Sequence, residues 1–273
     1  MRLLQPSSLD EAAAAGGLYL AGGTEVVPLL RNGLVRAETL VDLRPLVPRG
    51  VDGTRIGAGT TLAELEADPS VPDALREACR LAASPQLRSM GSVGGNLLQS
   101  TRCWYWRLGW NCRLHGGEEC FAQEGEHREH AIFANGFCAS AHPSDVAAAL
   151  LALGATVRTT RRELPVGDLY RLPTEDDRRT TTLEPGEAIL ELEVPRPERS
   201  VYLKAMERKR WAFPLVGVAA ALVAGEVRVA LAGVAPVPWL LEGDLDAATP
   251  LPRNAYKVDV AKALVRRARA ALA

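Results

Sequence analysis

The sequence predicts an α+β fold in two parts: a two-part α/β domain over residues 1–164, then a smaller domain with an antiparallel sheet and helices over residues 165–273. Two observations predict this fold class. Short apolar strands alternate with amphipathic helices in the first part, which is the pattern of parallel βαβ units. In the second part, strands follow one another with only turns between them. Residues 172–185, rich in proline and charge, indicate a loop or a boundary.

The elements of the first part are each supported by local signals. Ser8 can cap a short helix that Gly16 and Gly17 end, and Gly33 can end the next helix. An apolar strand runs into Gly22-Gly23-Thr24, and a later strand completes a βαβ unit. The expected elements are a helix at 9–15, a strand at 18–21, a helix from 26, strands at 40–43 and 54–58, and helices at 62–67 and 73–83.

The later elements follow from the same kinds of signal. Ser144 can cap an alanine-rich helix that ends at Gly154, and a strand follows at 155–160. The glycine in Ala224-Gly225-Glu226 predicts a hairpin turn between two strands. The remaining elements are strands at 188–194, 201–207, 216–223 and 227–235, and an amphipathic helix at 258–272.

Composition and charge exclude several classes of protein. The 273 residues carry a formal net charge of -1, which gives no general attraction to nucleic acid or to an anionic membrane. No apolar run approaches the ~20 residues of a membrane span, and the N-terminus lacks the apolar core of a signal peptide. Five cysteines without an export signal favour ligand thiols or buried thiols over a disulfide framework. We therefore expect a cytoplasmic protein, unless a partner subunit carries it elsewhere.

Two glycine loops have the chemistry of an anion site. Gly22-Gly23-Thr24 lies between a predicted strand and a predicted helix, where converging backbone N–H groups and the helix start create partial positive charge. The second loop, Gly91-Ser92-Val93-Gly94-Gly95-Asn96, repeats that chemistry later in the chain. A single glycine pair is more often a tight turn, but two such loops suit the pyrophosphate of a dinucleotide. The first loop lacks the G-x-G-x-x-G fingerprint, which disfavours nicotinamide binding of the Rossmann kind.

Four of the five cysteines lie in one segment rich in aromatic residues, at about 100–140. The gaps between Cys103, Cys112, Cys120 and Cys138 are eight, seven and seventeen residues. These gaps match neither the short knuckles of common zinc modules nor the tight runs of bacterial ferredoxins. Four thiolates can nevertheless close a tetrahedral zinc site or hold a four-iron cluster. The spacing alone leaves both metals open, beside the simpler explanation of scattered buried cysteines.

Other candidate ligands have simpler explanations. Cys79 lies on an apolar helix stripe, where a small buried thiol is sufficient. Asp145 follows the expected cap Ser144, and its charge could do no more than favour the start of the helix. For each histidine taken alone, a surface or hydrogen-bonding role is the better explanation; these are His115, His127, His130 and His142.

Four motifs stand out along the chain. They are Ala21-Gly22-Gly23-Thr24-Glu25, Ser92-Val93-Gly94-Gly95-Asn96, His142-Pro143-Ser144-Asp145 and Ala232-Gly233-Val234-Ala235-Pro236-Val237-Pro238-Trp239. In order and spacing they resemble the FAD-binding subunit of the xanthine dehydrogenase and carbon monoxide dehydrogenase family of molybdenum hydroxylases. The resemblance covers essentially the whole chain, so it implies a FAD-binding domain at residues 1–164 and a C-terminal flavoprotein domain at residues 165–273.

The resemblance also implies a set of FAD-binding residues. In that family the first two motifs embrace the pyrophosphate and the ribityl chain, and the Ser-Asp pair reaches the flavin. A lysine lies near the cofactor, and an apolar residue packs on its ring system. The corresponding positions here are Leu20, Ala21, Gly22, Gly23, Thr24, Glu25, Val26, Ser92, Gly94, Gly95, Asn96, Ser144, Asp145, Ile189 and Lys204.

The segment around the four cysteines narrows the resemblance. It contains Thr101-Arg102-Cys103-Trp104-Tyr105, then Gly116-Gly117 before Cys120, then Cys138 ahead of His142. This arrangement is similar to bacterial aldehyde oxidoreductases and 4-hydroxybenzoyl-CoA reductases, whose flavin subunits carry an extra 4Fe–4S cluster on four cysteines in this region. The resemblance therefore favours an iron–sulfur cluster over zinc. Its implied ligands are Cys103, Cys112, Cys120 and Cys138.

The resemblance implies an electron-transfer subunit of a heterotrimer. Electrons would pass between 2Fe–2S centres in a small subunit and an acceptor, through FAD and the 4Fe–4S cluster in this chain. Substrate chemistry would occur at a molybdenum cofactor in a large subunit, and no catalytic triad or carboxylate pair stands out here. Two alternatives remain: a self-sufficient flavin oxidoreductase, and a zinc-stapled binding module without redox activity.

Overall fold

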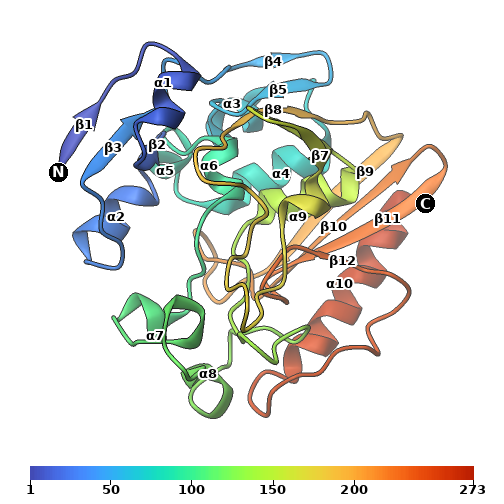
Figure 1. Cartoon of the computed structure of the whole chain (residues 1–273). Helices are drawn as coiled ribbons and strands as arrows, with labels where there is room; N and C mark the ends of the chain where they lie inside the picture. The colour runs from blue at the N-terminus through green and yellow to red at the C-terminus, as the bar shows by residue number, and fades with distance from the viewer.

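A computed structural model describes all of residues 1–273 and contains three β-sheets with helices packed around them (Figure 1). The fold is α+β, as the sequence predicts. None of the helices combines the length and the apolar character that a membrane span requires. The helices of the first part are α1 (Leu9–Ala14), α2 (Val26–Arg31), α3 (Leu62–Ala67), α4 (Asp73–Ala82), α5 (Pro85–Arg88) and α6 (Val93–Leu97).

The first sheet is small and parallel, with strand order β1-β3-β2. Strand β2 (Leu18–Leu20) leads through α2 to strand β3 (Thr39–Asp42), which confirms the predicted βαβ unit. Strand β1 (Arg2–Leu4) pairs with β3 and is not among the elements that the sequence predicts. Three residues are too few to carry the periodicity that marks a strand. The turn from β2 into α2 is the first glycine loop.

The second sheet is antiparallel and draws on both parts of the chain. Its strands, in spatial order, are β4 (Val51–Asp52), β5 (Arg55–Gly57), β8 (Ile189–Glu193), β6 (Thr156–Thr159) and β7 (Glu163–Pro165). Strand β8 lies beyond residue 165 in sequence, yet it pairs with both β5 and β6. The short 3-10 helix η2 (Val166–Leu169) follows β7. The first part therefore takes one strand from beyond residue 165, and the division at that residue stays a prediction.

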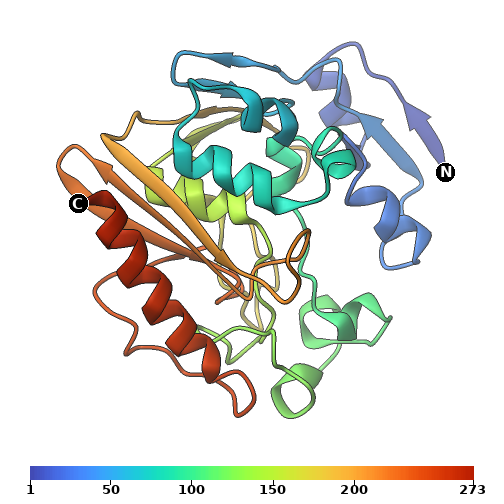
Figure 2. The same ribbon diagram turned by 180° about the vertical axis from the view of Figure 1, so that it is seen from behind.

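The third sheet is antiparallel and covered on both faces (Figure 2). Its strands, in spatial order, are β12 (Trp239–Leu240), β11 (Glu226–Ala232), β10 (Val216–Val223) and β9 (Arg199–Ala205). Helix α10 (Tyr256–Leu272) packs on one face, and α4 and α9 (Asp145–Leu153) pack on the other. Along β10, Val218 and Ala220 join one core and Ala219 and Ala221 the other, so the strand is apolar on both faces. The predicted hairpin and its covering helix are confirmed.

The cysteine-rich segment joins α6 to α9 and projects from the rest of the molecule at the lower end of Figure 1. It contains only short helices, namely α7 (Trp104–Arg107), η1 (Arg113–His115) and α8 (Phe121–Glu124). Aromatic packing replaces regular structure: the ring centroid of Tyr105 lies 5.4 Å from that of Trp110, which lies 4.8 Å from that of Phe121. Packing between aromatic side chains therefore stabilises this segment, which has little regular secondary structure.

Lys257 fastens the cysteine-rich segment to the third sheet. Its side chain is fully buried in the first turn of α10. The Nζ atom lies within hydrogen-bond distance of the carbonyl oxygens of Glu129 (3.0 Å), His130 (2.8 Å) and Gly233 (2.6 Å). Because burial disfavours the charged form, it lowers the pKa of Lys257 to about 7.

We expect Lys257 to make stability depend on pH between about pH 7 and about pH 10. In this range the unfolded chain holds a proton on Lys257 that the folded chain has released, so a rise in pH favours folding. Urea unfolding of the wild type and of a Lys257→Met variant at several pH values measures the effect. The wild type should gain stability relative to the variant as the pH rises, and parallel profiles would contradict the assignment.

Candidate functional site

A cleft of about 560 Å³ opens where the first sheet, the two glycine loops and the start of β8 meet. Its volume is in the usual range of a cofactor pocket. The predicted residues on its wall are Ala21, Gly22, Thr24, Glu25, Val26, Ser92, Gly94, Gly95 and Ile189. Other wall residues are not among those predicted from the sequence, including Tyr19, Arg44, Arg49, Met90 and Glu187. These come from separate elements, and no local motif marks them.

The first glycine loop has two separate requirements for glycine. Gly22 lies against Met90, the residue just before the second loop, and a Cβ at Gly22 would overlap the Met90 carbonyl oxygen. Gly23 has a φ of +75°, in the left-handed region that favours glycine. The backbone N–H groups of residues 22–25 have no acceptor within the chain. A run of unpaired donors at a cleft wall suits the diphosphate of a dinucleotide.

The second glycine loop forms the start of α6. The Oγ atom of Ser92 accepts the N–H of Gly95 at 3.2 Å and caps the helix. Gly94 packs against Ala58, and a Cβ at Gly94 would lie 3.0 Å from the Ala58 Cβ. Capping and close packing therefore explain part of this motif without a ligand. The position of Ser92 and Gly95 on the cleft wall keeps both available to one.

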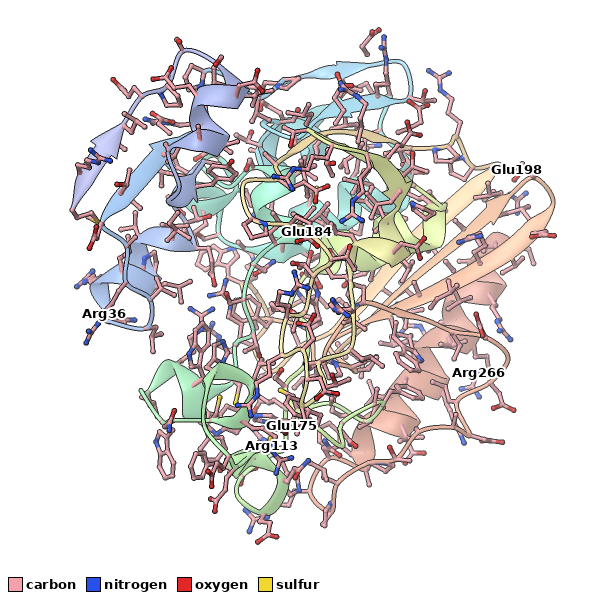
Figure 3. All side chains as sticks on the ribbon, in the orientation of Figure 1. Arg36, Arg113, Glu175, Glu184, Glu198 and Arg266 are labelled. Atoms are coloured by element: carbon pink, nitrogen blue, oxygen red, sulfur yellow. The ribbon has the colours of Figure 1, made fainter.

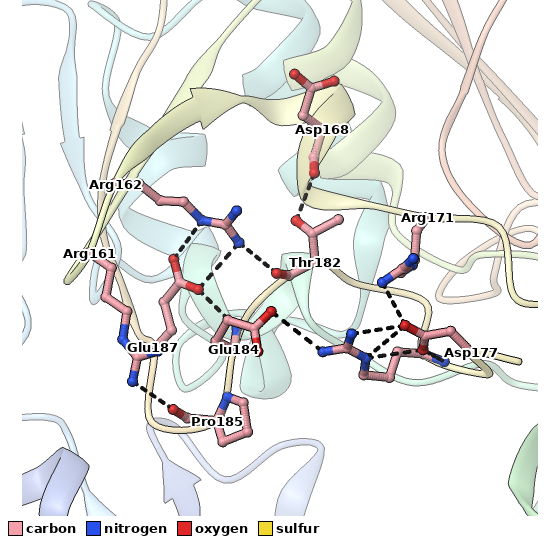
Figure 4. A network of polar contacts seen from close by, with 10 residues as sticks. Arg161, Arg162, Asp168, Arg171, Asp177, Thr182, Glu184, Pro185 and Glu187 are labelled. Atoms are coloured by element: carbon pink, nitrogen blue, oxygen red, sulfur yellow. Dashed lines mark hydrogen bonds and ion pairs between the residues drawn. The ribbon is translucent and has the colours of Figure 1, made fainter.

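The third wall of the cleft is the segment that leads into β8, and ion pairs hold this segment in place (Figure 4). The pairs are Arg162–Glu187 (3.1 Å), Arg171–Asp177 (2.7 Å) and Arg179–Asp177 (2.8 Å). The side chain of Glu187 is fully buried, and the Tyr19 hydroxyl donates to the carbonyl oxygen of neighbouring Gly186 at 2.8 Å. The loop predicted at residues 172–185 is bonded to the α/β part through Arg161 and Arg162, which donate to the carbonyl oxygens of Pro185 and Thr182.

The remaining predicted FAD residues do not line the cleft; these are Leu20, Gly23, Asn96, Ser144, Asp145 and Lys204. The Ser144 hydroxyl caps α9 and donates to Asn96 Oδ1 at 2.6 Å. Asp145 is fully buried, and burial raises the pKa of its carboxyl group. Its carboxylate accepts from the Tyr202 hydroxyl and pairs with Lys204 at 2.8 Å. The structure thus places the Asp145–Lys204 ion pair in the core, and the contact with flavin that the resemblance implies stays a prediction.

Glu25 connects the cleft to the cysteine-rich segment. Its carboxylate pairs with Arg102 at 2.6 Å and with Arg107 at 2.7 Å, and it accepts the N–H of Ser100 at 3.2 Å. Arg102 immediately precedes Cys103, and Arg107 ends α7. Because Glu25 also lines the cleft, one side chain ties the first glycine loop to the chain on both sides of Cys103.

The four cysteines of the predicted metal site line one cavity. Its wall includes Cys103, Cys112, Cys120 and Cys138 together with Tyr105, Trp106, Phe121 and Phe137. The cavity is small, about 10 Å³, which is room for about one water. No three His, Cys, Asp or Glu side chains in the chain are arranged to hold a single metal ion. The structure brings the four predicted ligands together, and the group that they bind stays a prediction.

The five thiols differ in their chemistry. A hydrogen bond between the Cys120 and Cys138 thiols lowers the pKa of Cys120 to about 6 and raises the pKa of Cys138 well above its usual value. Burial raises the pKa of Cys103 to about 11 and also raises that of Cys112. Cys79 is fully buried on α4 in the larger core, which confirms its prediction as a core residue.

A second cavity of about 480 Å³ lies between the cleft and the cysteine cavity. It shares Leu98 with the cleft, and it shares Thr101, Leu114 and Ser140 with the cysteine cavity. Arg178 on its wall donates to the carbonyl oxygen of Arg113 at 2.8 Å and pairs with Glu175. Arg113 and Glu175 are labelled in Figure 3. The two candidate cofactor sites are therefore linked by one continuous set of wall residues.

Comparison with known proteins decides the family. Residues 1–197 match the family model of the FAD-binding domain in molybdopterin dehydrogenases. The chain belongs to this family. The FAD-binding subunit PaoB of aldehyde oxidoreductase from Escherichia coli (strain K12) is 35% identical over 259 residues, with 86% of this chain and 80% of that protein covered. This chain is accordingly a FAD-binding medium subunit of the molybdenum hydroxylase family, and relatives of this kind are subunits of oxidoreductases.

Solved structures share the fold of this medium subunit over nearly its full length. A chain of carbon monoxide dehydrogenase from Hydrogenophaga pseudoflava, in a form that lacks the molybdenum-pyranopterin moiety, matches with a TM-score of 0.71 at 24% identity. The match covers 99% of this chain and 96% of that chain. A chain of quinoline 2-oxidoreductase from Pseudomonas putida 86 matches with a TM-score of 0.67 at 20% identity, over 98% and 95% of the two chains. These identities establish the fold alone.

In this FAD-binding subunit, Gly22→Ala should weaken FAD binding about tenfold or more, which corresponds to about 1.4 kcal/mol. The added Cβ would overlap the Met90 carbonyl oxygen, so the two glycine loops would have to separate. Fluorimetry of FAD released from the purified protein measures occupancy. Gly136→Ala is a matched control, because a Cβ there meets no atom within 4 Å. Equal FAD occupancy in the two variants would contradict the role of the loop contact.

Proposed function

We propose that this medium subunit transfers electrons through FAD and through a 4Fe–4S cluster that the same chain holds. Electrons would enter from 2Fe–2S centres in a small partner subunit, after substrate chemistry at a molybdenum cofactor in a large one, and would leave to an acceptor. The observation that carries the proposal is the convergence of Cys103, Cys112, Cys120 and Cys138 on one cavity. A cubane cluster with four irons takes one thiolate per iron.

Different residues of the cleft would contact different parts of FAD. The free N–H groups of residues 22–25 would bind its diphosphate, and Ile189 would pack against its ring system. When bound, FAD supplies the redox chemistry, and the protein positions it and sets its potential. Glu25 and Glu187 are the acidic residues on the cleft wall, and both are engaged in ion pairs. We therefore assign no catalytic acid or base to this chain.

The cysteine-rich segment has the features of a cluster site that forms on loading. The four thiols line one small cavity among loops and short helices, which can adjust as a cluster forms. Ligation energy is also folding energy, so loading of the cluster should order this segment. Trp106 and Phe121 would shield a cluster from water and so tune its potential.

Two other functions would use the same residues. A zinc-stapled module without redox activity would use the same four thiols around a single ion, and metal analysis distinguishes it from an iron–sulfur cluster. A self-sufficient flavin oxidoreductase would need a substrate base at the cleft, where the acidic side chains are already paired. The link between cleft and cysteine cavity through Leu98 and Ser140 favours electron transfer between two centres over either alternative.

The cofactor content of the anaerobically purified protein tests the proposal. We expect about one FAD, about four irons and about four labile sulfides per chain, with a broad iron–sulfur absorbance beneath the flavin bands. Metal analysis should accompany the spectrum, because a purified chain can lose a cofactor. FAD without iron after reconstitution would leave the self-sufficient flavoprotein, and stoichiometric zinc would favour the zinc-stapled module.

A further inference from the structure

Each sulfur of the cysteine cavity has a hydrogen-bond partner that is not a cysteine. In two contacts the donor is fixed: the Ala139 N–H donates to Cys120 Sγ (3.5 Å), and the Cys138 thiol donates to Ser140 Oγ (3.1 Å). The other two contacts are His130 Nε2 with Cys103 Sγ (3.3 Å) and His115 Nδ1 with Cys112 Sγ (3.4 Å), and their direction depends on which ring nitrogen carries the proton. Two of the four partners are imidazoles, and neither has a role in the proposed ligation.

Tryptophan side chains fix the orientation of both imidazoles. The ring of His115 stacks on Trp106, with centroids 3.9 Å apart and planes 7° apart. The ring of His130 lies edge-on to Trp104, with centroids 4.6 Å apart and planes 85° apart. Each ring therefore presents one particular nitrogen to one sulfur, as a residue built to support a ligand does.

The surroundings of His130 indicate which nitrogen carries its proton. The side chain is 3% exposed, and its Nδ1 atom is buried with no hydrogen-bond partner. A buried N–H without an acceptor is rarer in proteins than a buried acceptor without a donor. The proton is therefore assigned to Nε2, where it faces the sulfur of Cys103. For His115, the nitrogen that faces Cys112 is Nδ1, and the residue also lines the second cavity.

We infer that His130 and His115 are positioning residues that donate N–H hydrogen bonds to two ligand sulfurs and thereby raise the reduction potential of the cluster. This inference rests on the proposed 4Fe–4S cluster. One-electron reduction adds negative charge to the cluster and its thiolates, with no proton transferred. A hydrogen bond to a charged acceptor is stronger, so a donor aimed at sulfur stabilises the reduced form more than the oxidised form.

The test uses substitutions matched to the nitrogen that makes each contact. Glutamine at position 130 places its amide nitrogen near the site of Nε2, and asparagine at position 115 places its amide nitrogen near the site of Nδ1. Leucine removes the donor at either position. We expect His130→Leu and His115→Leu each to lower the reduced-to-oxidised ratio at a fixed potential about tenfold, which is about 59 mV for one electron. His130→Gln and His115→Asn should restore most of it.

The midpoint potential is read by redox titration of the anaerobically reconstituted full chain, followed by electron paramagnetic resonance, with iron and sulfide assayed for each variant. His127→Gln is the control, because His127 bonds to the Ala122 carbonyl oxygen and the Arg253 N–H and contacts no cysteine. Its potential should equal that of the wild type. If a leucine variant does not retain iron, His130→Gln and His130→Asn are compared, since only the glutamine reaches the site of Nε2.

Two results would overturn the inference, and they are distinguishable. Unchanged potentials in both leucine variants, at full iron content, would remove the histidine role and leave the cluster in place. Equal midpoint potentials in His130→Gln and His130→Asn would likewise show that His130 donates no hydrogen bond to the cluster. Absence of iron and sulfide from the reconstituted wild type would overturn the proposed cluster, and the inference with it.

Discussion

Cys112→Ser should reduce the iron and labile sulfide of the purified protein toward zero. A 4Fe–4S cluster needs one thiolate per iron, and a serine hydroxyl at this site does not replace it. The same result is expected for Cys103→Ser, Cys120→Ser and Cys138→Ser. Because ligation energy is also folding energy, each change should loosen the cysteine-rich segment and increase its proteolysis. Iron and sulfide assays after anaerobic purification, with electron paramagnetic resonance of the reduced protein, measure the loss.

The internal control is Cys79→Ser, because Cys79 is fully buried on α4 in a separate apolar core. This variant should keep its iron and lose only stability, by about 1–3 kcal/mol for a hydroxyl placed in the core. Iron lost with Cys79→Ser but kept with Cys112→Ser would show that the ligands are wrongly assigned. Zinc in place of iron in every variant would show that the metal is wrongly assigned.

Lys204→Met should lower the free energy of unfolding by about 3–5 kcal/mol, the usual cost of removing one partner from a buried ion pair. The Lys204 ammonium has 0% exposure, and it pairs with Asp145 and donates to the carbonyl oxygen of Leu81 at 2.9 Å. Without it, the Asp145 carboxylate remains buried with only the Tyr202 hydroxyl as a partner. Urea unfolding monitored by circular dichroism measures the change.

Two further variants separate the buried pair from a general effect of lysine. Lys262 forms an exposed pair with Asp246 at 3.4 Å, so Lys262→Met should change stability by less than about 1 kcal/mol. The double variant Asp145→Asn with Lys204→Met should be more stable than Lys204→Met alone, because no unpaired charge is left in the core. Equal stability of Lys204→Met and the wild type would refute the structural role. A loss of FAD at unchanged stability would favour the contact with flavin that the resemblance implies.

Local elements of the fold could be predicted because their signals are local. Ser144 and Gly154 mark the two ends of α9, and the structure has them as N-cap and left-handed C-cap. The pairing of β8 with β5 and β6 could not be predicted, because a strand's own residues do not specify its partner in a distant part of the chain. Strand β1 is too short to show a pattern and is held by its pairing with β3.

The candidate site divides along the same line. The glycine loops and the cysteine-rich segment are visible in the sequence because each is a dense local cluster of one chemistry. Three sets of contacts could not be predicted from the sequence. They are the Asp145–Lys204 pair, the ion pairs of Glu25 with Arg102 and Arg107, and the contacts of His115 and His130 with sulfur. Each joins side chains from separate elements or depends on which nitrogen a ring presents. The spacing of residues along the sequence does not specify such contacts.

The number of electrons that one chain accepts tests the central claim most directly. FAD takes up two electrons and a 4Fe–4S cluster takes up one, so anaerobic reductive titration of the reconstituted protein should end at about three electrons per chain. The Cys112→Ser variant, with FAD bound and the cluster absent, should end at about two. An end point of about two electrons in the fully reconstituted wild type would contradict the account, because the chain would then hold the flavin alone.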